Sequence, residues 1–262
     1  SGLGTPEGLA ALTREELVRG WSERARPSGA VLAVAGDLDA AGGVDALASI
    51  LDRLLAGWSG SAPGVQPGTA PTRGTYLHIE DASAQVQVAL MHEGPPEPHP
   101  DSKLERIANT VLSGGMAARL FTEVREKRGL CYSVSASYAT DRDFGRSVAY
   151  VGTTPERAQE SLDVLLAELH RINTPAGRIT GDEFQRAMTG IRANLIFSGE
   201  STGARAAALA GDQHRLGRPR SLQEIAGEYA KITLDQVNAY LSRRSLGPVT
   251  IVTLGPAALT PP

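Results

Sequence analysis

Residues 112–132 read LSGGMAARLFTEVREKRGLCY, and this stretch decides the fold. Its two glycines predict a tight turn, and the apolar residues that follow recur at helical spacing. A further glycine ends that predicted helix, and a strand is expected to begin near Leu130. Arg125 and Tyr132 lie seven residues apart across this helix-to-strand junction. Both carry polar side chains with long reach.

Composition places broad limits on function. The 262 residues, 41% of them hydrophobic, can bury one large core or two smaller ones. A net charge of −3 gives no reason to expect a nucleic acid or an acidic membrane as partner. We expect no membrane span, because no apolar run approaches the roughly 18 residues that one requires. The sequence as given opens without a basic-then-apolar leader, and its single cysteine weakly fits a reducing compartment, so a cytoplasmic location is predicted.

The chain divides into three parts by composition. Residues 1–58 predict helix, strand and helix, with a capping box at Thr13 and a buried strand at 30–35. Residues 59–74 are rich in Gly, Pro, Ser and Thr, which predicts a linker at a domain boundary. Residues 75–262 predict strands at 76–79, 86–91, 130–139, 146–151 and 249–254 among long helices, two of them capped at Thr180 and Thr233. This order indicates an α+β or mixed α/β sandwich.

An internal repeat supports this division. Residues 12–36 and 232–255 each combine a capped helix, a short basic turn and an apolar run ending in glycine, at an offset of roughly 220 residues. If the repeat marks a duplication, the second unit spans about 75–255, and the first would need about 145 residues upstream of Ser1. The alternative is that any two helix–strand units resemble each other at this level.

The sequence offers neither a metal site nor a nucleophile. None of the five histidines occurs in an H-E-x-x-H or H-x-x-E-H pattern, so surface or helix-capping histidines are expected. Cys131 has no neighbouring histidine and is interpreted as a buried structural thiol. Arg125 and Tyr132 remain: a guanidinium can donate to peptide carbonyls, and a phenol can donate to a developing oxyanion. The alternative is an arginine on a solvated helix face, together with Arg119 and Arg128, and a tyrosine in the core.

The opening stretch also resembles a known motif. In the M16 (pitrilysin or insulinase-like) zinc peptidases the second half carries a run of the type L-G-G-G-x-x-S-R-L-F-x-x-[IV]-R-x-x-x-G-L-x-Y. Ala117 and Ala118 depart from it, where small polar residues are common. The residues that match it without a gap are Leu112, Gly114, Gly115, Arg119, Leu120, Phe121, Val124, Arg125, Gly129, Leu130 and Tyr132. The resemblance, of the M16B type, covers nearly all of residues 1–255.

This resemblance implies a fold and a function. The fold would be α+β, an M16 metallopeptidase-like (LuxS/MPP-like) α/β sandwich with a mixed or antiparallel sheet flanked by long helices. Residues 1–58 would be the tail of a first domain, and 75–262 a complete second domain. Arg125 and Tyr132 match the pair that holds substrate and acts in catalysis. The H-x-x-E-H zinc motif is absent from this sequence, so zinc would be bound by a partner subunit or a missing half, and none by this chain.

Three interpretations follow from the resemblance. The chain could be the non-metal subunit of a heterodimeric zinc endopeptidase that binds an extended peptide. It could be a catalytically silent scaffold or peptide-binding subunit of the same family. If an N-terminal part with the zinc motif exists, it could instead be half of a homodimeric protease.

Overall fold

The structure is a computed structural model that describes residues 4–64 and 73–261. The chain separates into two compact units, Ser1–Ala70 and Pro71–Pro262. Half of the predicted linker, residues 65–72 of 59–74, lies outside the described residues.

The first unit consists of short helices without a core. Its elements are α1 (Pro6–Ala10), α2 (Arg14–Arg24), the 3-10 turn η1 (Asp39–Ala41) and α3 (Gly43–Leu55). The capping box predicted at Thr13 is confirmed: the Thr13 hydroxyl accepts from the Glu16 amide at 3.2 Å, and the Glu16 carboxylate accepts from the Thr13 amide at 3.0 Å. None of residues 4–64 is buried, and Trp21 is 75% exposed.

The buried strand predicted at 30–35 is wrong. These residues form no strand, and Leu32 is 63% exposed. A strand requires a neighbour that pairs with its backbone amides and carbonyls. Among the described residues of this unit, no second extended segment supplies that neighbour.

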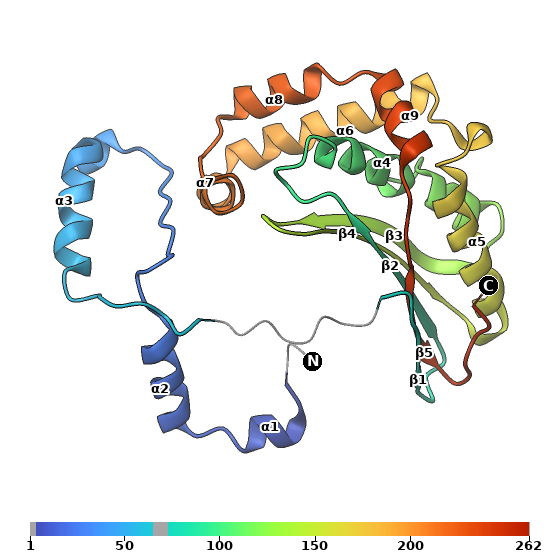
Figure 1. Ribbon diagram of the computed structural model, residues 1–262, viewed down its shortest axis with the longest axis horizontal. Helices are drawn as coiled ribbons and strands as arrows, with labels where there is room; N and C mark the ends of the chain where they lie inside the picture. Colours follow the sequence, from blue (N-terminus) through green and yellow to red (C-terminus); the bar gives the residue numbers. More distant parts are fainter. Residues whose placement is uncertain (1–3, 65–72, 262) are drawn as a thin grey trace. The chain divides into compact units, whose positions relative to one another are not determined.

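The second unit is built on a mixed sheet with the strand order β1-β5-β2-β4-β3 (Figure 1). The strands are β1 (Tyr76–Glu80), β2 (Val86–Gly94), β3 (Cys131–Thr140), β4 (Gly145–Thr153) and β5 (Thr250–Gly255). All five lie where the sequence predicts them. β1 pairs with β5 in parallel, and the remaining pairs are antiparallel. The predicted α+β fold with a mixed sheet is therefore confirmed.

Helices cover one face of this sheet (Figure 1). α4 packs on β3, and α5 packs on β2 and β4, while α6 and α9 pack on α4. α7 and α8 pack in turn on α6. The helices are α4 (Ser102–Ser113), α5 (Ala158–Arg171, after the 3-10 turn η3 Pro155–Arg157), α6 (Gly181–Glu200, after the 3-10 turn η4 Pro175–Gly177), α7 (Thr202–Leu216), α8 (Leu222–Ala230) and α9 (Leu234–Arg243).

Burial alternates along the central strands. In β2, Val86, Val88 and Leu90 are fully buried, whereas the residues between them are only partly buried. The period of two places the apolar side chains toward α4 and α5 and leaves the opposite face of the sheet partly open. The core therefore lies between the sheet and the helical layer.

A polar cluster is buried inside this core. The Glu105 carboxylate accepts from Arg244 at 2.6 Å, from the Tyr240 hydroxyl at 2.6 Å and from the Ser147 hydroxyl at 2.8 Å. Glu105 has no exposed surface, and His92 beside it is 3% exposed. The sequence-based expectation of surface or capping histidines is thus wrong for His92, because its ring faces Arg244 at 3.3 Å.

Candidate functional site

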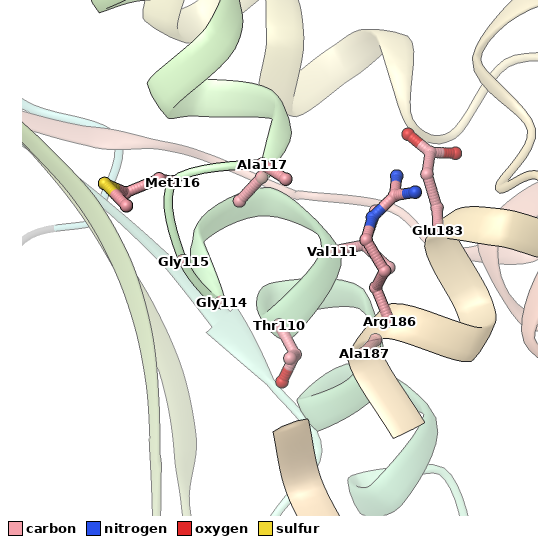
Figure 2. A pocket seen from close by; sticks show the side chains of 10 residues that line it. Thr110, Val111, Gly114, Gly115, Met116, Ala117, Glu183, Arg186 and Ala187 are labelled. Carbon is pink, nitrogen blue, oxygen red and sulfur yellow. The ribbon is translucent and has the colours of Figure 1, made fainter. Parts of the chain in front are cut away.

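The Gly114–Gly115 turn follows α4 directly. The Gly114 amide donates to the Thr110 carbonyl at 2.6 Å, and a Cβ at position 114 would lie 2.4 Å from that same oxygen. Only glycine fits such a close approach. The turn borders a cavity of about 200 Å³ between α4 and α6. Figure 2 shows Glu183 and Arg186 of α6 on one side of it, with Met116 extending away from them.

Arg119 ties this part of the motif to the start of α6. Its guanidinium binds both carboxylate oxygens of Glu183, at 2.6 and 2.7 Å, and donates to the carbonyls of Gly177 and Arg178. Although burial opposes the shift, the hydrogen bond from Arg119 lowers the pKa of Glu183 to about 2. Arg119 is 8% exposed, so it does not share the solvated face that the alternative gave to Arg125, whereas Arg125 and Arg128 are both exposed.

The helix predicted over 117–124 takes a different form. Only Arg119 and Leu120 have α-helical geometry, and a π-helix, η2, spans Phe121–Glu126. The Lys127 amide donates to the Thr122 carbonyl, five residues back, at 3.0 Å. Single π turns of this kind occur frequently at functional sites. The apolar positions remain inside, since Leu120 and Val124 are fully buried.

Arg125 differs from its basic neighbours on η2. Lys127 and Arg128 both bind Glu123, at 2.7 and 2.9 Å, and the hydrogen bonds from these two cations lower the pKa of Glu123. Arg125 is exposed, and its guanidinium stacks on the Phe121 ring, 4.9 Å from the centroid. Within the described part of the chain no carboxylate pairs with it. Its hydrogen-bond donors can therefore reach a ligand.

The chain turns sharply between η2 and β3. Gly129 has φ = +60°, and its amide donates to the Arg125 carbonyl at 3.0 Å. The Leu130 amide then donates to the Val124 carbonyl at 3.0 Å, and the Leu130 side chain is buried. These contacts fix the position of Arg125 relative to the first residues of β3.

Tyr132 occupies an irregularity in β3. Cys131 pairs with Thr153 and Ser133 pairs with Gly152, so Tyr132 is an extra residue without a partner on β4. A β-bulge of this kind re-aims the side chain that it carries. The Tyr132 side chain is 65% exposed, which overturns the alternative of a core tyrosine. Both Arg125 and Tyr132 thus lie at local departures from regular backbone geometry.

The strand that carries Tyr132 is an edge strand. β3 pairs with β4 on one side, and within residues 73–261 no strand pairs with its other side. Its backbone groups on that side can receive an extended chain. Cys131, next to Tyr132, is half-buried; burial raises the pKa of its thiol, and the nearby charge of Arg125 opposes that rise.

No zinc site forms from the residues of this chain that the structure describes. They contain no group of three or more His, Cys, Asp or Glu side chains that could hold a metal ion. His92, the most buried histidine, is engaged by Arg244 and by the Glu93 carbonyl. The donor set of the described residues therefore does not fit a zinc ion. None of the described helices is both long and apolar enough to cross a bilayer.

Comparison with known families decides the identity of the fold. The family model described as "Peptidase M16 inactive domain" matches residues 11–191. The chain belongs to the peptidase M16 family. The match includes the whole 112–132 motif, together with α2 and α3 of the first unit.

Relatives and solved structures agree with this assignment. An uncharacterized zinc protease of Streptomyces coelicolor is 28% identical over 94% of this chain, which covers 54% of that protein. A peptidase M16 inactive domain from Pseudomonas fluorescens matches all of the chain with a TM-score of 0.74 and 22% identity, over 62% of its own length. A protease from Helicobacter pylori matches 96% of the chain with a TM-score of 0.78 and 16% identity, over 61% of its length. This M16 chain thus spans little more than half of the curated relative.

The sequence indicated Arg125 and Tyr132 of this M16 domain, but not the backbone features that expose their side chains. The bulge at Tyr132 and the π-helix at Arg125 depend on hydrogen bonds to Thr153, Gly152 and Thr122. The glycine at 129 was the only local signal of an abrupt backbone turn. The roles of Arg125 and Tyr132 in binding or catalysis remain predictions.

Proposed function

We propose that this chain is the non-metal half of an M16 zinc endopeptidase. In this proposal it binds an extended peptide and helps stabilise the transition state at a zinc site that a partner subunit or a missing half supplies. The observation that carries the proposal is the presentation of Arg125 and Tyr132. Tyr132 is exposed at the start of β3, a strand whose outer edge is unpaired within residues 73–261, and Arg125 is exposed on η2 just before that strand. Arg125 lacks a carboxylate partner among the described residues.

Each side chain has a distinct role in this proposal. The planar guanidinium of Arg125, supported by the Phe121 ring, donates to backbone carbonyls of the peptide and fixes its register. The Tyr132 hydroxyl donates to the scissile carbonyl oxygen, where negative charge develops in the transition state. The open edge of β3 offers amides and carbonyls to the peptide backbone. The metal chemistry lies outside this chain.

The first unit supports a larger assembly. We infer that residues 1–58 are the tail of a first M16-like domain, that 59–74 link it to the second, and that 75–262 form the second domain. The apolar segment 30–35 and the amphipathic α3 leave Leu32 and Leu54 exposed at 63% and 75%. A sheet in a further domain would pair with this segment and cover both. The partner would then be a zinc-bearing subunit in a heterodimer, or a second copy if an upstream part carries the zinc motif. We propose a cytoplasmic location for this assembly.

Peptide turnover tests the proposal. The chain is assembled with its zinc-bearing half, and hydrolysis of a quenched fluorescent peptide is followed. Tyr132→Phe is expected to lower kcat/KM by about 10²- to 10³-fold, the loss typical when one donor to an oxyanion is removed. Arg125→Ala is expected to lower it by about 10²-fold, because the peptide would no longer be held in register. Arg146→Ala is the matched control, because Arg146 is also an exposed arginine stacked on a phenylalanine, 5.5 Å from the Phe144 centroid.

The outcomes separate two functions. Loss of turnover in the two site variants, with the control unchanged, supports the peptidase half. Unchanged turnover in all three would contradict it, and would leave the catalytically silent scaffold as the interpretation.

A further inference from the structure

A second cavity lies at the far end of β3. It has a volume of about 670 Å³ and is bounded by the last three residues of the strand, Tyr138–Thr140, and by α4, α6 and α8. Cavities of roughly 300–1,000 Å³ are typical of ligand sites. Tyr132 and Tyr138 are six residues apart on the same strand, which corresponds to about 20 Å. One extended peptide along the edge of β3 could therefore reach both.

Cations dominate the polar lining of this cavity. It contains Lys103, Arg106, Arg215 and Arg220, and a single carboxylate, Glu97. Arg106 and Arg220 bind Glu97 at 3.1 and 3.3 Å, and Arg220 also binds Asp212 and Glu228 from behind. Three of the four cations are thus paired, since Lys103 lies 3.3 Å from Glu228.

Arg215 is the exception. Its Nε is buried and has no hydrogen-bond partner among the described residues. The neighbouring Arg205 shows the same feature at Nη1, although its Nη2 donates to the Arg220 carbonyl at 2.6 Å. Arg215 forms no hydrogen bond or ion pair among the described residues, although its charge helps to lower the pKa values of Asp141 and Asp212. Its guanidinium lines the cavity and can therefore bind an anion there.

The remaining lining fits a peptide side chain. Tyr138, Tyr229 and Ile225 supply apolar surface beside the cations. Burial raises the pKa of Tyr138 to about 12 and also raises that of Tyr229, so neither phenol carries a negative charge near neutral pH. The Arg106 guanidinium lies over the Tyr138 ring, 5.2 Å from its centroid, and both residues line the cavity.

We propose that this cavity binds a carboxylate of the peptide that lies along β3, about six residues from the position beside Tyr132. The substrate class is therefore peptides with an acidic side chain, or a free C-terminus, at that distance. This inference rests on the proposed peptide-binding function. It adds a second contact that selects which peptides bind and in which register.

Binding of labelled peptides to the full chain provides the test. The probes are fluorescein-labelled extended peptides that carry one glutamate, matched by peptides with glutamine at the same position. Both are made with free and with amidated C-termini, and dissociation constants are measured by fluorescence anisotropy. The glutamate peptide is expected to bind about tenfold more tightly than its glutamine match, as one added charge-assisted hydrogen bond implies.

Two variants address the cavity itself. Arg215→Gln and Asn194→Glu are each expected to abolish the preference for glutamate; Asn194 is an exposed residue of α6 at the cavity wall, where glutamate is compatible with a helix. Arg186→Gln is the control, because it removes one positive charge from an exposed position on the same helix, outside this cavity. If peptides with a free C-terminus bind more tightly than amidated ones, whether or not they contain glutamate, the carboxylate in the cavity is the C-terminus of the peptide.

The results distinguish this inference from the proposed function. Equal affinity for all probes, still weakened by Arg125→Ala, overturns the cavity site and leaves peptide binding at β3 intact. A glutamate preference that depends on Arg215 but not on Arg125 or Tyr132 supports the cavity and contradicts the proposed pair. No binding of any probe overturns both.

Discussion

At the scale of single residues, the buried cluster around Glu105 ties the helical layer to the sheet. The cluster joins α4, α9 and the two central strands β2 and β4 through charged and hydrogen-bonded groups. Although burial would raise the pKa of Glu105, the Arg244 charge and the Tyr240 hydrogen bond outweigh it, and the pKa is lowered. Burial and the Arg244 charge lower the pKa of His92. His92 is therefore neutral in the folded protein near neutral pH.

We expect the protein to lose stability as the solution is acidified. The lowered pKa of His92 means that its contribution is complete above about pH 6.5, its unfolded value, and is lost progressively below it. Glu105 and Glu183, both with lowered pKa values, add a further loss below about pH 4.5. Urea unfolding at a series of pH values from about 7.5 down to about 2 measures both steps.

The His92→Gln variant isolates the first step. Its free energy of unfolding should change less than that of the wild type between pH 7 and 5, because no imidazole has to be protonated in the core. His99→Gln, at a side chain that is 48% exposed, serves as the control and should keep the wild-type slope. An unchanged slope in His92→Gln would show that another group controls the acid transition.

Two arginines of the motif differ in burial in a way that their local sequence does not show. Arg119 and Arg125 lie six positions apart in one motif, yet the first is buried and the second exposed. What separates them is Glu183, 64 residues further along the chain from Arg119. No local pattern reports a partner at that distance, so helical spacing alone could not separate the two arginines, and the choice of Arg125 rested on the resemblance to the M16 motif.

At the scale of elements, the sequence predicted helix caps correctly, because they depend on neighbouring residues. It did not predict features that depend on contacts with distant parts of the chain. The capping boxes at Thr13, Thr180 and Thr233 all form, since each depends on residues only three positions apart. The strand expected at 30–35 does not form, because strand pairing needs a distant partner. The π-helix replaced a predicted α-helix, since the apolar spacing of Leu120 and Val124 satisfies both forms.

The junction between η2 and β3 leads to a prediction about Gly129. A Cβ there would meet nothing closer than 3.8 Å, so the cost of Gly129→Ala comes from its φ of +60° alone. We expect a loss of about 1–2 kcal/mol in the free energy of unfolding. Urea denaturation gives this value directly.

Gly190 offers the matched comparison within α6. A Cβ at this position would contact nothing within 4 Å, and the glycine lies inside a regular helix. Gly190→Ala should therefore raise the free energy of unfolding by about 0.5–1 kcal/mol. If Gly129→Ala also raised the free energy of unfolding, the positive φ at Gly129 would carry no strain, contrary to this prediction.

At the scale of the whole molecule, the two units differ in how they are stabilised. The second has a continuous apolar core around Leu90, Ile107 and Leu162, all fully buried. The first has no buried residue among positions 4–64. Little free energy opposes local unfolding where so few apolar groups are removed from water.

This contrast predicts that proteases cleave the first unit before the second. Trypsin should cleave the isolated chain at Arg14, Arg24 or Arg53 long before it cuts within residues 76–255, as mass spectrometry of the fragments would show. Addition of the zinc-bearing half should slow these early cuts, because the proposed first domain would cover α3. A resistant fragment that retains residues 4–58 of the isolated chain would contradict the prediction.

The order of strands in the sheet has a consequence for biosynthesis. β5 is the last strand among the described residues, yet it lies between β1 and β2, and Tyr76 pairs with Ile251. At about 5–20 residues per second, translation needs roughly 10–35 s to deliver the partner of β1 after β1 itself. During that interval Leu77 and Ile79 of the nascent chain have no sheet to join. A chain released by the ribosome before residue 250 would therefore have β2, β3 and β4 able to pair, but β1 without its partner strand. Chaperones would be expected to bind such a chain.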